Sequence, residues 1–201
     1  MHRIVFFLIG VVIISLSGVM MPGPVLAATI AKGYESGKSG ILISIGHGII
    51  EFPLMLLIFL GMLSFLSEEM KTIIGILGGG ALIYLGINMI RSKEGERDES
   101  FPYPSIFLGF ITSASNPYFF LWWVTVGAAL IVASMEYGTF GFLMFAITHW
   151  MSDLGWYSFV SFSVNRSRNL WSEKTKKIIF STCGLILIGF GIYFLISVMQ
   201  T

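Results

Sequence analysis

The segment IVFFLIGVVIISLSGVMMPGPVLAATIA, residues 4–31, decides the class of this protein, because its 28 residues include no charged side chain. A helix needs about 20 predominantly apolar residues to cross the hydrocarbon core of a bilayer, which is roughly 30 Å thick. Backbone polar groups that face lipid must be satisfied within their own segment, so a helix is the expected structure. Residues 4–31 therefore predict a membrane-spanning helix.

Five more segments repeat this pattern. They are residues 39–67, 72–90, 100–135, 137–165 and 178–201, and together they hold two charged residues, Glu51 and Asp153. The whole chain is 55% hydrophobic and 11% charged, whereas soluble domains carry about 25% charged residues. We expect an all-α integral membrane protein with six transmembrane helices in the lipid bilayer. A soluble enzyme domain has no room, so we expect no enzyme and no cofactor, and a net charge of +1 indicates no nucleic-acid partner.

The basic residues predict the orientation. Arg3 and Lys71 fall on one side of the predicted bundle. The other side carries ten basic residues, namely Lys32, Lys38, Arg91, Lys93, Arg97, Arg166, Arg168, Lys174, Lys176 and Lys177. Cytoplasmic loops carry the excess of Lys and Arg. The sequence therefore predicts a multi-pass protein of the cytoplasmic (plasma) membrane with both termini outside.

The chain contains an internal repeat. Three motifs recur in the same order at offsets of 98, 102 and 105 residues: Ser15-x-Ser17-Gly18 with Ser113-x-Ser115-Asn116, His47-x3-Glu51 with His149-x3-Asp153, and Lys71-Thr-Ile-Ile with Lys176-Lys-Ile-Ile. The last offset also aligns Gly79 with Gly184 and Gly86 with Gly191. Three helices per half is an odd number, so the second half enters the membrane from the opposite side, as in many transporters. We expect a first repeat at 1–91, a charged cytoplasmic linker at 92–104 and a second repeat at 105–201.

Proline interrupts the first helix of each half. The motifs are Pro22-Gly23-Pro24 in helix 1 and Asn116-Pro117 in helix 4. Proline removes a backbone donor, and the groups freed there need neighbouring helices, water or a ligand as partners. Half-helix ends also carry partial charges that suit a substrate. We expect both helices to be broken at candidate substrate-binding positions, together with Ser113 and Ser115; a kink stabilised by packing is the alternative.

Glu51 and Asp153 lie deep inside predicted spans, where an acidic residue costs about 2.5–3.5 kcal/mol. Each follows a histidine, His47 or His149, by four residues, which places both members of a pair on one helix face. The pairs fit three roles: proton carriers, counter-charges for a cationic or ammonium-bearing substrate, or ligands of a divalent metal such as Zn²⁺. Hydrogen bonding that only locks the bundle is the structural alternative.

Two other features have simpler interpretations. Trp122, Trp123, Trp150 and Trp156 fit aromatic belts at the membrane interface better than a binding site. Gly75-x3-Gly79 fits either the face of a homodimer or close packing within the bundle, and we expect internal packing.

The sequence resembles the lysine-exporter (LysE-type) family of amino-acid translocators. The residues that carry the resemblance are Pro22-Gly23-Pro24, Ala31-Lys32-Gly33, Gly86 before Arg91, and the run GFITSASNP at 109–117. The length and the six hydrophobic segments agree with that family. The resemblance implies a small inner-membrane exporter, driven by an ion gradient, that acts on amino acids or similar metabolites.

The sequence also departs from that family. Val25 follows the first break where the family often has a polar residue, and Tyr118 follows the second where it often has lysine. The doubled His-x3-acid pattern is instead similar to that of cation diffusion facilitators, six-helix metal exporters. Those usually carry a cytoplasmic metal-binding C-terminal domain, whereas this chain ends two residues after Met199, with both termini predicted outside. The substrate is therefore left open.

We expect a secondary transporter, an antiporter that exports amino acids or related small metabolites in exchange for protons. Glu51 and Asp153 would bind the cationic group of the substrate or exchange protons, and His47 and His149 would tune their pKa values. The helix breaks would hold the carboxylate and ammonium of the substrate. Two alternatives are a divalent metal-cation exporter with the same four side chains as ligands, and a non-transporting membrane scaffold without a cavity.

Overall fold

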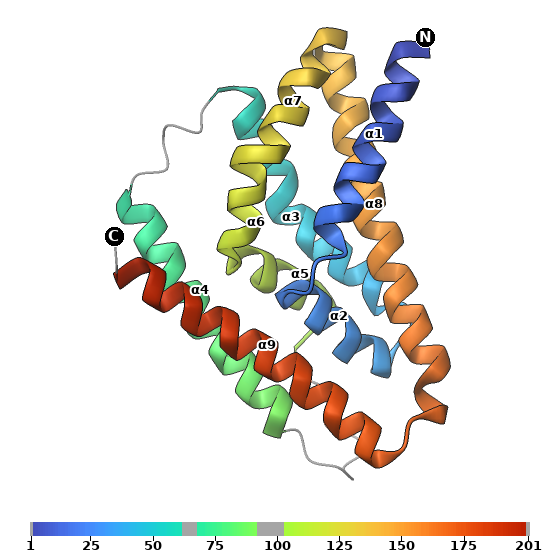
Figure 1. Ribbon diagram of the computed structural model, residues 1–201, viewed down its shortest axis with the longest axis vertical. Coiled ribbons are helices and arrows are strands. Elements are labelled where there is room, and N and C mark those ends of the chain that lie inside the picture. The colour runs from blue at the N-terminus through green and yellow to red at the C-terminus, as the bar shows by residue number, and fades with distance from the viewer. Residues whose placement is uncertain (1, 62–67, 92–102, 200–201) are drawn as a thin grey trace.

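The computed structural model describes residues 2–61, 68–91 and 103–199, and these residues form helices without a strand (Figure 1). The helices are α1 (His2–Val19), α2 (Pro24–Glu35), α3 (Ser39–Phe59), α4 (Glu68–Arg91), α5 (Ser105–Ala114), α6 (Pro117–Trp122), α7 (Ala128–Ser134), α8 (Gly138–Ser167) and α9 (Glu173–Met199). A π-helical turn, η2 (Trp123–Gly127), joins α6 to α7, and the 3-10 turns η3 (Met135–Tyr137) and η4 (Arg168–Leu170) flank α8.

Four helical runs among the described residues are long and apolar enough to cross a membrane: His2–Val19, Ser39–Phe59, Tyr118–Leu170 and Glu173–Tyr193. The run Tyr118–Leu170 joins α6 to α8 and covers two of the predicted spans. Large apolar side chains cover the outside of the bundle, and Phe6 and Leu77 are about 70% exposed. The prediction of an all-helical, multi-pass membrane protein is therefore confirmed.

The chain leaves helical conformation near both proline motifs. α1 ends at Val19, and α2 begins at Pro24 after Gly23, whose backbone is extended. α5 ends at Ala114, and α6 begins at Pro117. Proline suits the first position of a helix, because its missing N–H would have no partner there and its φ is already helical.

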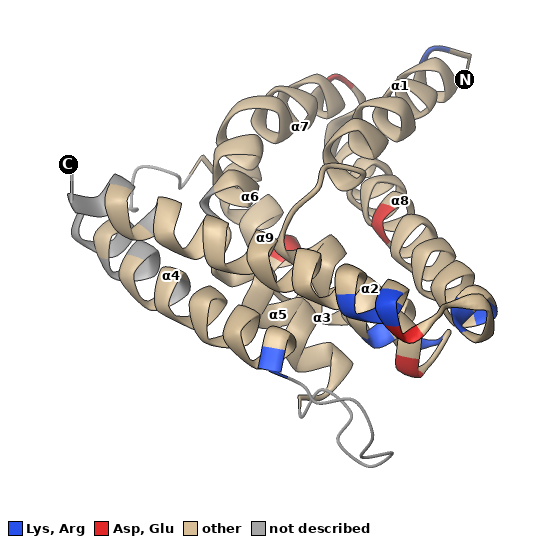
Figure 2. Ribbon diagram, turned by 60° about the horizontal axis from the view of Figure 1, so that its bottom comes forward, with Lys and Arg blue, Asp and Glu red and all other residues tan. Residues whose placement is uncertain are grey.

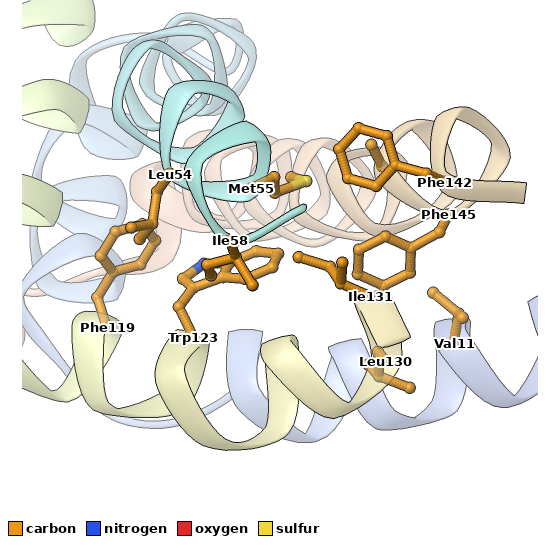
Figure 3. Close-up of a cluster of buried hydrophobic side chains, with 11 residues drawn as sticks. Val11, Leu54, Met55, Ile58, Phe119, Trp123, Leu130, Ile131, Phe142 and Phe145 are labelled. Carbon is orange, nitrogen blue, oxygen red and sulfur yellow. The ribbon is translucent and has the colours of Figure 1, made fainter. Parts of the chain in front are cut away.

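Aromatic and aliphatic side chains pack α3 against α1, α6, α7 and α8 (Figure 3). The buried cluster consists of Val11, Leu54, Met55, Ile58, Phe119, Trp123, Leu130, Ile131, Phe142, Phe145 and Ala146. At its edge the rings of Phe59 and Phe142 stack with centroids 4.1 Å apart. This packing fixes α3 beside α8, the two helices that carry the predicted His-x3-acid pairs.

Helices α4 and α9 lie side by side along their length (Figure 1). Two glycine pairs bring the backbones of these helices into contact. A Cβ at Gly79 would lie 2.8 Å from the carbonyl oxygen of Gly191, and a Cβ at Gly86 would lie 2.5 Å from the carbonyl oxygen of Gly184. Small residues allow helix backbones to approach this closely in membranes. Gly79 thus packs within the chain, as expected, and a homodimer stays a prediction.

Basic residues lie at the end of the bundle where α2, α4 and α8 finish (Figure 2). There the Arg168 guanidinium donates to the carbonyl oxygens of Tyr34 and Glu35 at 3.0 and 3.1 Å, where α2 ends. Lys32 donates to Glu35 at 2.6 Å. Cations at a helix C-terminus stabilise it, so these bonds hold α2 against the connection between α8 and α9. The predicted linker residues Lys93 and Arg97 lie outside the described residues.

Candidate functional site

Helices α3 and α8 bring the two His-x3-acid pairs into one buried cluster. Glu51 and Asp153 are each 1% exposed, and His149 and His47 are 3% and 5% exposed. Oε1 of Glu51 lies 3.1 Å from Nε2 of both His47 and His149, so both imidazoles converge on one carboxylate oxygen. Nε2 of His149 also lies 3.6 Å from Oδ2 of Asp153. The arrangement is asymmetric, because Glu51 contacts both rings at hydrogen-bond distance.

Two serines hold the far side of the imidazoles. The Ser15 hydroxyl lies 2.7 Å from Nδ1 of His149, and the Ser113 hydroxyl lies 2.6 Å from Nδ1 of His47. The Ser113 hydroxyl also lies 2.6 Å from the carbonyl oxygen of Gly109, an acceptor one turn earlier in α5. Each serine therefore binds the histidine of the opposite half of the chain, and both bonds turn Nε2 toward Glu51.

Aromatic rings enclose the histidines. Trp122 stacks on His149 with centroids 5.1 Å apart, and Trp123 meets the same ring edge-on at 4.9 Å. Phe119 meets His47 edge-on at 5.1 Å. The two tryptophans are consecutive and stand where α6 passes into the π-helical turn η2, a local structure that often marks functional sites.

The cluster faces a small central cavity of about 70 Å³. Its lining residues are Ser15, Gly18, Val19, Val25, His47, Glu51, Asn116, Tyr118, Phe119, Trp122, Trp123, His149, Asp153 and Tyr157. An adjoining cavity of about 50 Å³ shares six of them and adds Met21, Pro22, Gly23, Leu26 and Phe190. Oε2 of Glu51 and Oδ2 of Asp153 are buried without a hydrogen-bond partner in the described part of the chain, so each can accept from a ligand.

A family model described as LysE type translocator matches residues 16–198. The chain belongs to the LysE type translocator family. The chain is also similar to a protein of Bacillus subtilis (strain 168) named "Putative amino acid efflux protein YcgF", with 28% identity over 184 residues that cover 86% of this chain and 87% of that protein. No solved structure matches the chain significantly. The resemblance seen in the sequence is thus confirmed, and the chain is a membrane transporter.

The predicted site residues of this LysE type translocator do not all line the two cavities. Those that line the central cavity are Glu51, Asp153, His47, His149 and Asn116, and those that line the adjoining cavity are Pro22, Gly23 and again Asn116. Ser113 lies behind His47. Pro24 and Ser115 are buried and line neither cavity as described. Pro117 begins α6, and its side chain lies outside the described residues.

Several lining residues escaped the sequence reasoning. Tyr157 follows Asp153 by four residues, as Asp153 follows His149, so extending that spacing by one turn would have found it. The sequence marks Ser15 only as part of the repeat. It favours an interfacial position for Trp122 and Trp123, yet both contact His149. Nothing in the sequence separates these two tryptophans from interfacial ones, because tryptophan is enriched at both membrane interfaces.

The same translocator site offers donors for a cation. One donor atom each from His47, Glu51 and Asp153 lies within 4.8 Å of the others, and all three residues are buried. Imidazole nitrogen and carboxylate oxygen both bind Zn²⁺. A divalent metal as the transported substrate is therefore chemically compatible with this part of the site.

Proposed function

We propose that this translocator exports amino acids or related small metabolites from the cytoplasm in exchange for protons. The observation that carries the proposal is the pair of buried carboxylates, Glu51 and Asp153, which line one cavity and each keep one oxygen without a hydrogen-bond partner among the described residues. Buried acidic groups in a membrane protein mark ion and substrate pathways. The name of the B. subtilis relative supports amino-acid efflux.

Competition between substrate and proton gives the coupling. A substrate ammonium binds where Oε2 of Glu51 and Oδ2 of Asp153 offer unused acceptors. A proton that enters from outside neutralises a carboxylate and removes its attraction for the ammonium. His47 and His149 hold Glu51 in place through their Nε2 atoms, so substrate and proton exchange at an ordered site.

The two halves act as inverted repeats in this proposal. The bond from Ser15 to His149 becomes the bond from Ser113 to His47 when each residue is replaced by its match in the other half. In this proposal the chain crosses the membrane six times, through α1 with α2, α3, α4, α5 with α6 and α7, α8, and α9. The repeats are 1–91 and 105–201, and most of the linker 92–104 lies outside the described residues. Transporter sites lie where such repeats meet, as Glu51 and Asp153 do here.

The orientation follows from charge. The basic end of the bundle in Figure 2 faces the cytoplasm, because cytoplasmic loops carry the Lys and Arg excess. Both termini then lie outside the plasma membrane. A C-terminal tag on intact cells should be accessible to an impermeant reagent, and protection of that tag would reverse the orientation.

A solute screen in inverted membrane vesicles tests the function. In these vesicles export is measured as uptake, so we expect at least one L-amino acid to accumulate when the lumen is acidified. Vesicles without the protein and vesicles treated with a protonophore are the controls. Accumulation of none of the twenty protein amino acids would refute amino-acid export, and accumulation that survives the protonophore would refute proton coupling.

Metal export is the second candidate, favoured by the donor group of His47, Glu51 and Asp153. If amino acids are the substrate, we expect the purified protein to hold less than one Zn²⁺, Cd²⁺ or Mn²⁺ per chain after equilibration with the ions. Elemental analysis measures this content. A stoichiometric ion that is lost in His47→Ala would establish the metal alternative instead.

A non-transporting scaffold is the third interpretation of the sequence. It predicts a bundle without a cavity, in which Glu51 and Asp153 bind only their histidines. Both carboxylates line the central cavity, and the family consists of translocators. These two observations are against a scaffold.

A further inference from the structure

Helix α2 begins with backbone donors that no group in the described chain accepts. Pro24 has no N–H, and the first intrahelical bond runs from the N–H of Ala27 to the carbonyl of Gly23. The N–H groups of Val25 and Leu26 therefore have no acceptor within the helix. The capping position is Gly23, which has no side chain to accept them.

At the equivalent start of α6 the first backbone N–H groups do have acceptors. The Asn116 side chain accepts from the N–H of Tyr118 at 3.1 Å, and the Asn116 carbonyl accepts from the N–H of Phe119 at 3.0 Å. The two proline motifs look alike in sequence, but among the described residues only the helix start at α2 has backbone N–H groups without an acceptor. The difference is a single side chain, Gly23 against Asn116.

The N-terminus of α2, where these N–H groups lie, borders the two cavities. Val25 lines both of them, and Gly23 and Leu26 line the adjoining one. A helix N-terminus carries about half a positive charge and is suited to bind an anionic group. The central cavity that Val25 lines also holds the unpartnered oxygens of Glu51 and Asp153, which need a positively charged donor. The start of α2 and the two carboxylates therefore offer complementary charges to one ligand, at two cavities that share six lining residues.

We propose that the N-terminus of α2 binds the carboxylate of a free α-amino acid while Glu51 and Asp153 bind its ammonium. This inference rests on the proposed function and deepens it. It makes the substrate class one that carries both charged groups, so an amine without the carboxylate is a poor substrate. The start of α6 takes no part in carboxylate binding.

Gly23 allows a sharp test, because a side chain fits there. Its φ of −164° and ψ of −177° are extended values that any residue adopts. A Cβ at this position would have only the carbonyl oxygen of Met21 within 4 Å, at 3.8 Å. Asparagine at the capping position accepts the open N–H groups and stabilises the helix. Gly23→Asn should therefore stabilise the protein and weaken substrate binding, whereas damage to the fold would lower both.

The experiment uses the full-length protein in proteoliposomes and an L-amino acid identified by the vesicle screen. It compares that amino acid with its decarboxylated amine and its des-amino acid; for leucine these are isoamylamine and isocaproate. We expect the wild type to prefer the amino acid over the amine by about tenfold or more, the value of a hydrogen bond to a charged group. Gly23→Asn should remove most of that preference and keep or raise the melting temperature. Gly23→Ala, which adds a Cβ without an acceptor, separates the effect of the added volume from that of the added acceptor.

Two results would overturn the inference: a folded Gly23→Asn protein with the wild-type preference, or a wild-type protein that transports amine and amino acid equally well. If Gly23→Asn fails to fold, Gly23→Ser provides the same kind of acceptor on a smaller side chain. Failure of the proposed function is distinguishable, because then no amino acid is transported at all. Equal transport of amino acid and amine removes only the role of α2.

Discussion

Glu51→Gln and Asp153→Asn should each reduce gradient-driven efflux by about 100-fold or more. Both substitutions keep the shape of the side chain and remove its charge and its ability to take up a proton. Breaking a buried charge pair costs about 3–5 kcal/mol, and each 1.4 kcal/mol is a factor of ten. Glu51 is 1% exposed and lies 3.1 Å from both histidines, so Glu51→Gln should also lower the melting temperature. Asp153 has the looser contact, 3.6 Å from His149, so Asp153→Asn should affect stability less.

Efflux from proteoliposomes, with and without an imposed pH gradient, measures this effect. Ser152→Ala is a matched control, because Ser152 precedes Asp153, is also buried and donates to the carbonyl of Thr148 at 3.1 Å. It should retain efflux within about twofold, as expected for the loss of one neutral hydrogen bond. Retention of full gradient-driven efflux by both Glu51→Gln and Asp153→Asn would show that the carboxylates do not couple transport.

The centre of the site could be predicted from sequence because its signals are local. An acidic residue inside an apolar span is costly wherever the helix lies, so Glu51 and Asp153 stand out without a structure. A spacing of four residues places each histidine on the same helix face as its acid. Both rules depend only on the helix itself, and the pairs do meet between α3 and α8.

The other features of the site depend on contacts between segments that are distant in sequence. That both histidines converge on Glu51 rather than each on its own acid follows from the packing of α3 against α8. The role of Ser15 requires α1 to lie beside α8, 134 residues away in sequence. The difference between the two breaks was readable in principle, because glycine cannot cap a helix with a side chain and asparagine can.

The packing of α4 against α9 gives the second prediction of large effect. Gly86→Leu and Gly191→Leu should each prevent folding or lower the free energy of unfolding by about 3 kcal/mol or more, at the upper end of overpacking costs. A Cβ at Gly86 would lie 2.5 Å from the Gly184 carbonyl oxygen, and one at Gly191 would lie 2.6 Å from that of Gly79. These atoms are backbone, so the helices must separate along their contact. Thermal melting of detergent-purified protein measures the loss.

The controls place the same side chain on the same helices. Gly80 in α4 and Gly189 in α9 have nothing within 4 Å of a Cβ, so Gly80→Leu and Gly189→Leu should fold and melt near the wild-type temperature. Gly86 and Gly191 are matched positions of the two halves, offset by 105 residues. If the halves are related by a two-fold axis, their leucine variants should lose similar amounts of stability. A large loss at one position and none at the other would contradict the inverted repeat, because a two-fold relation makes the two contacts the same.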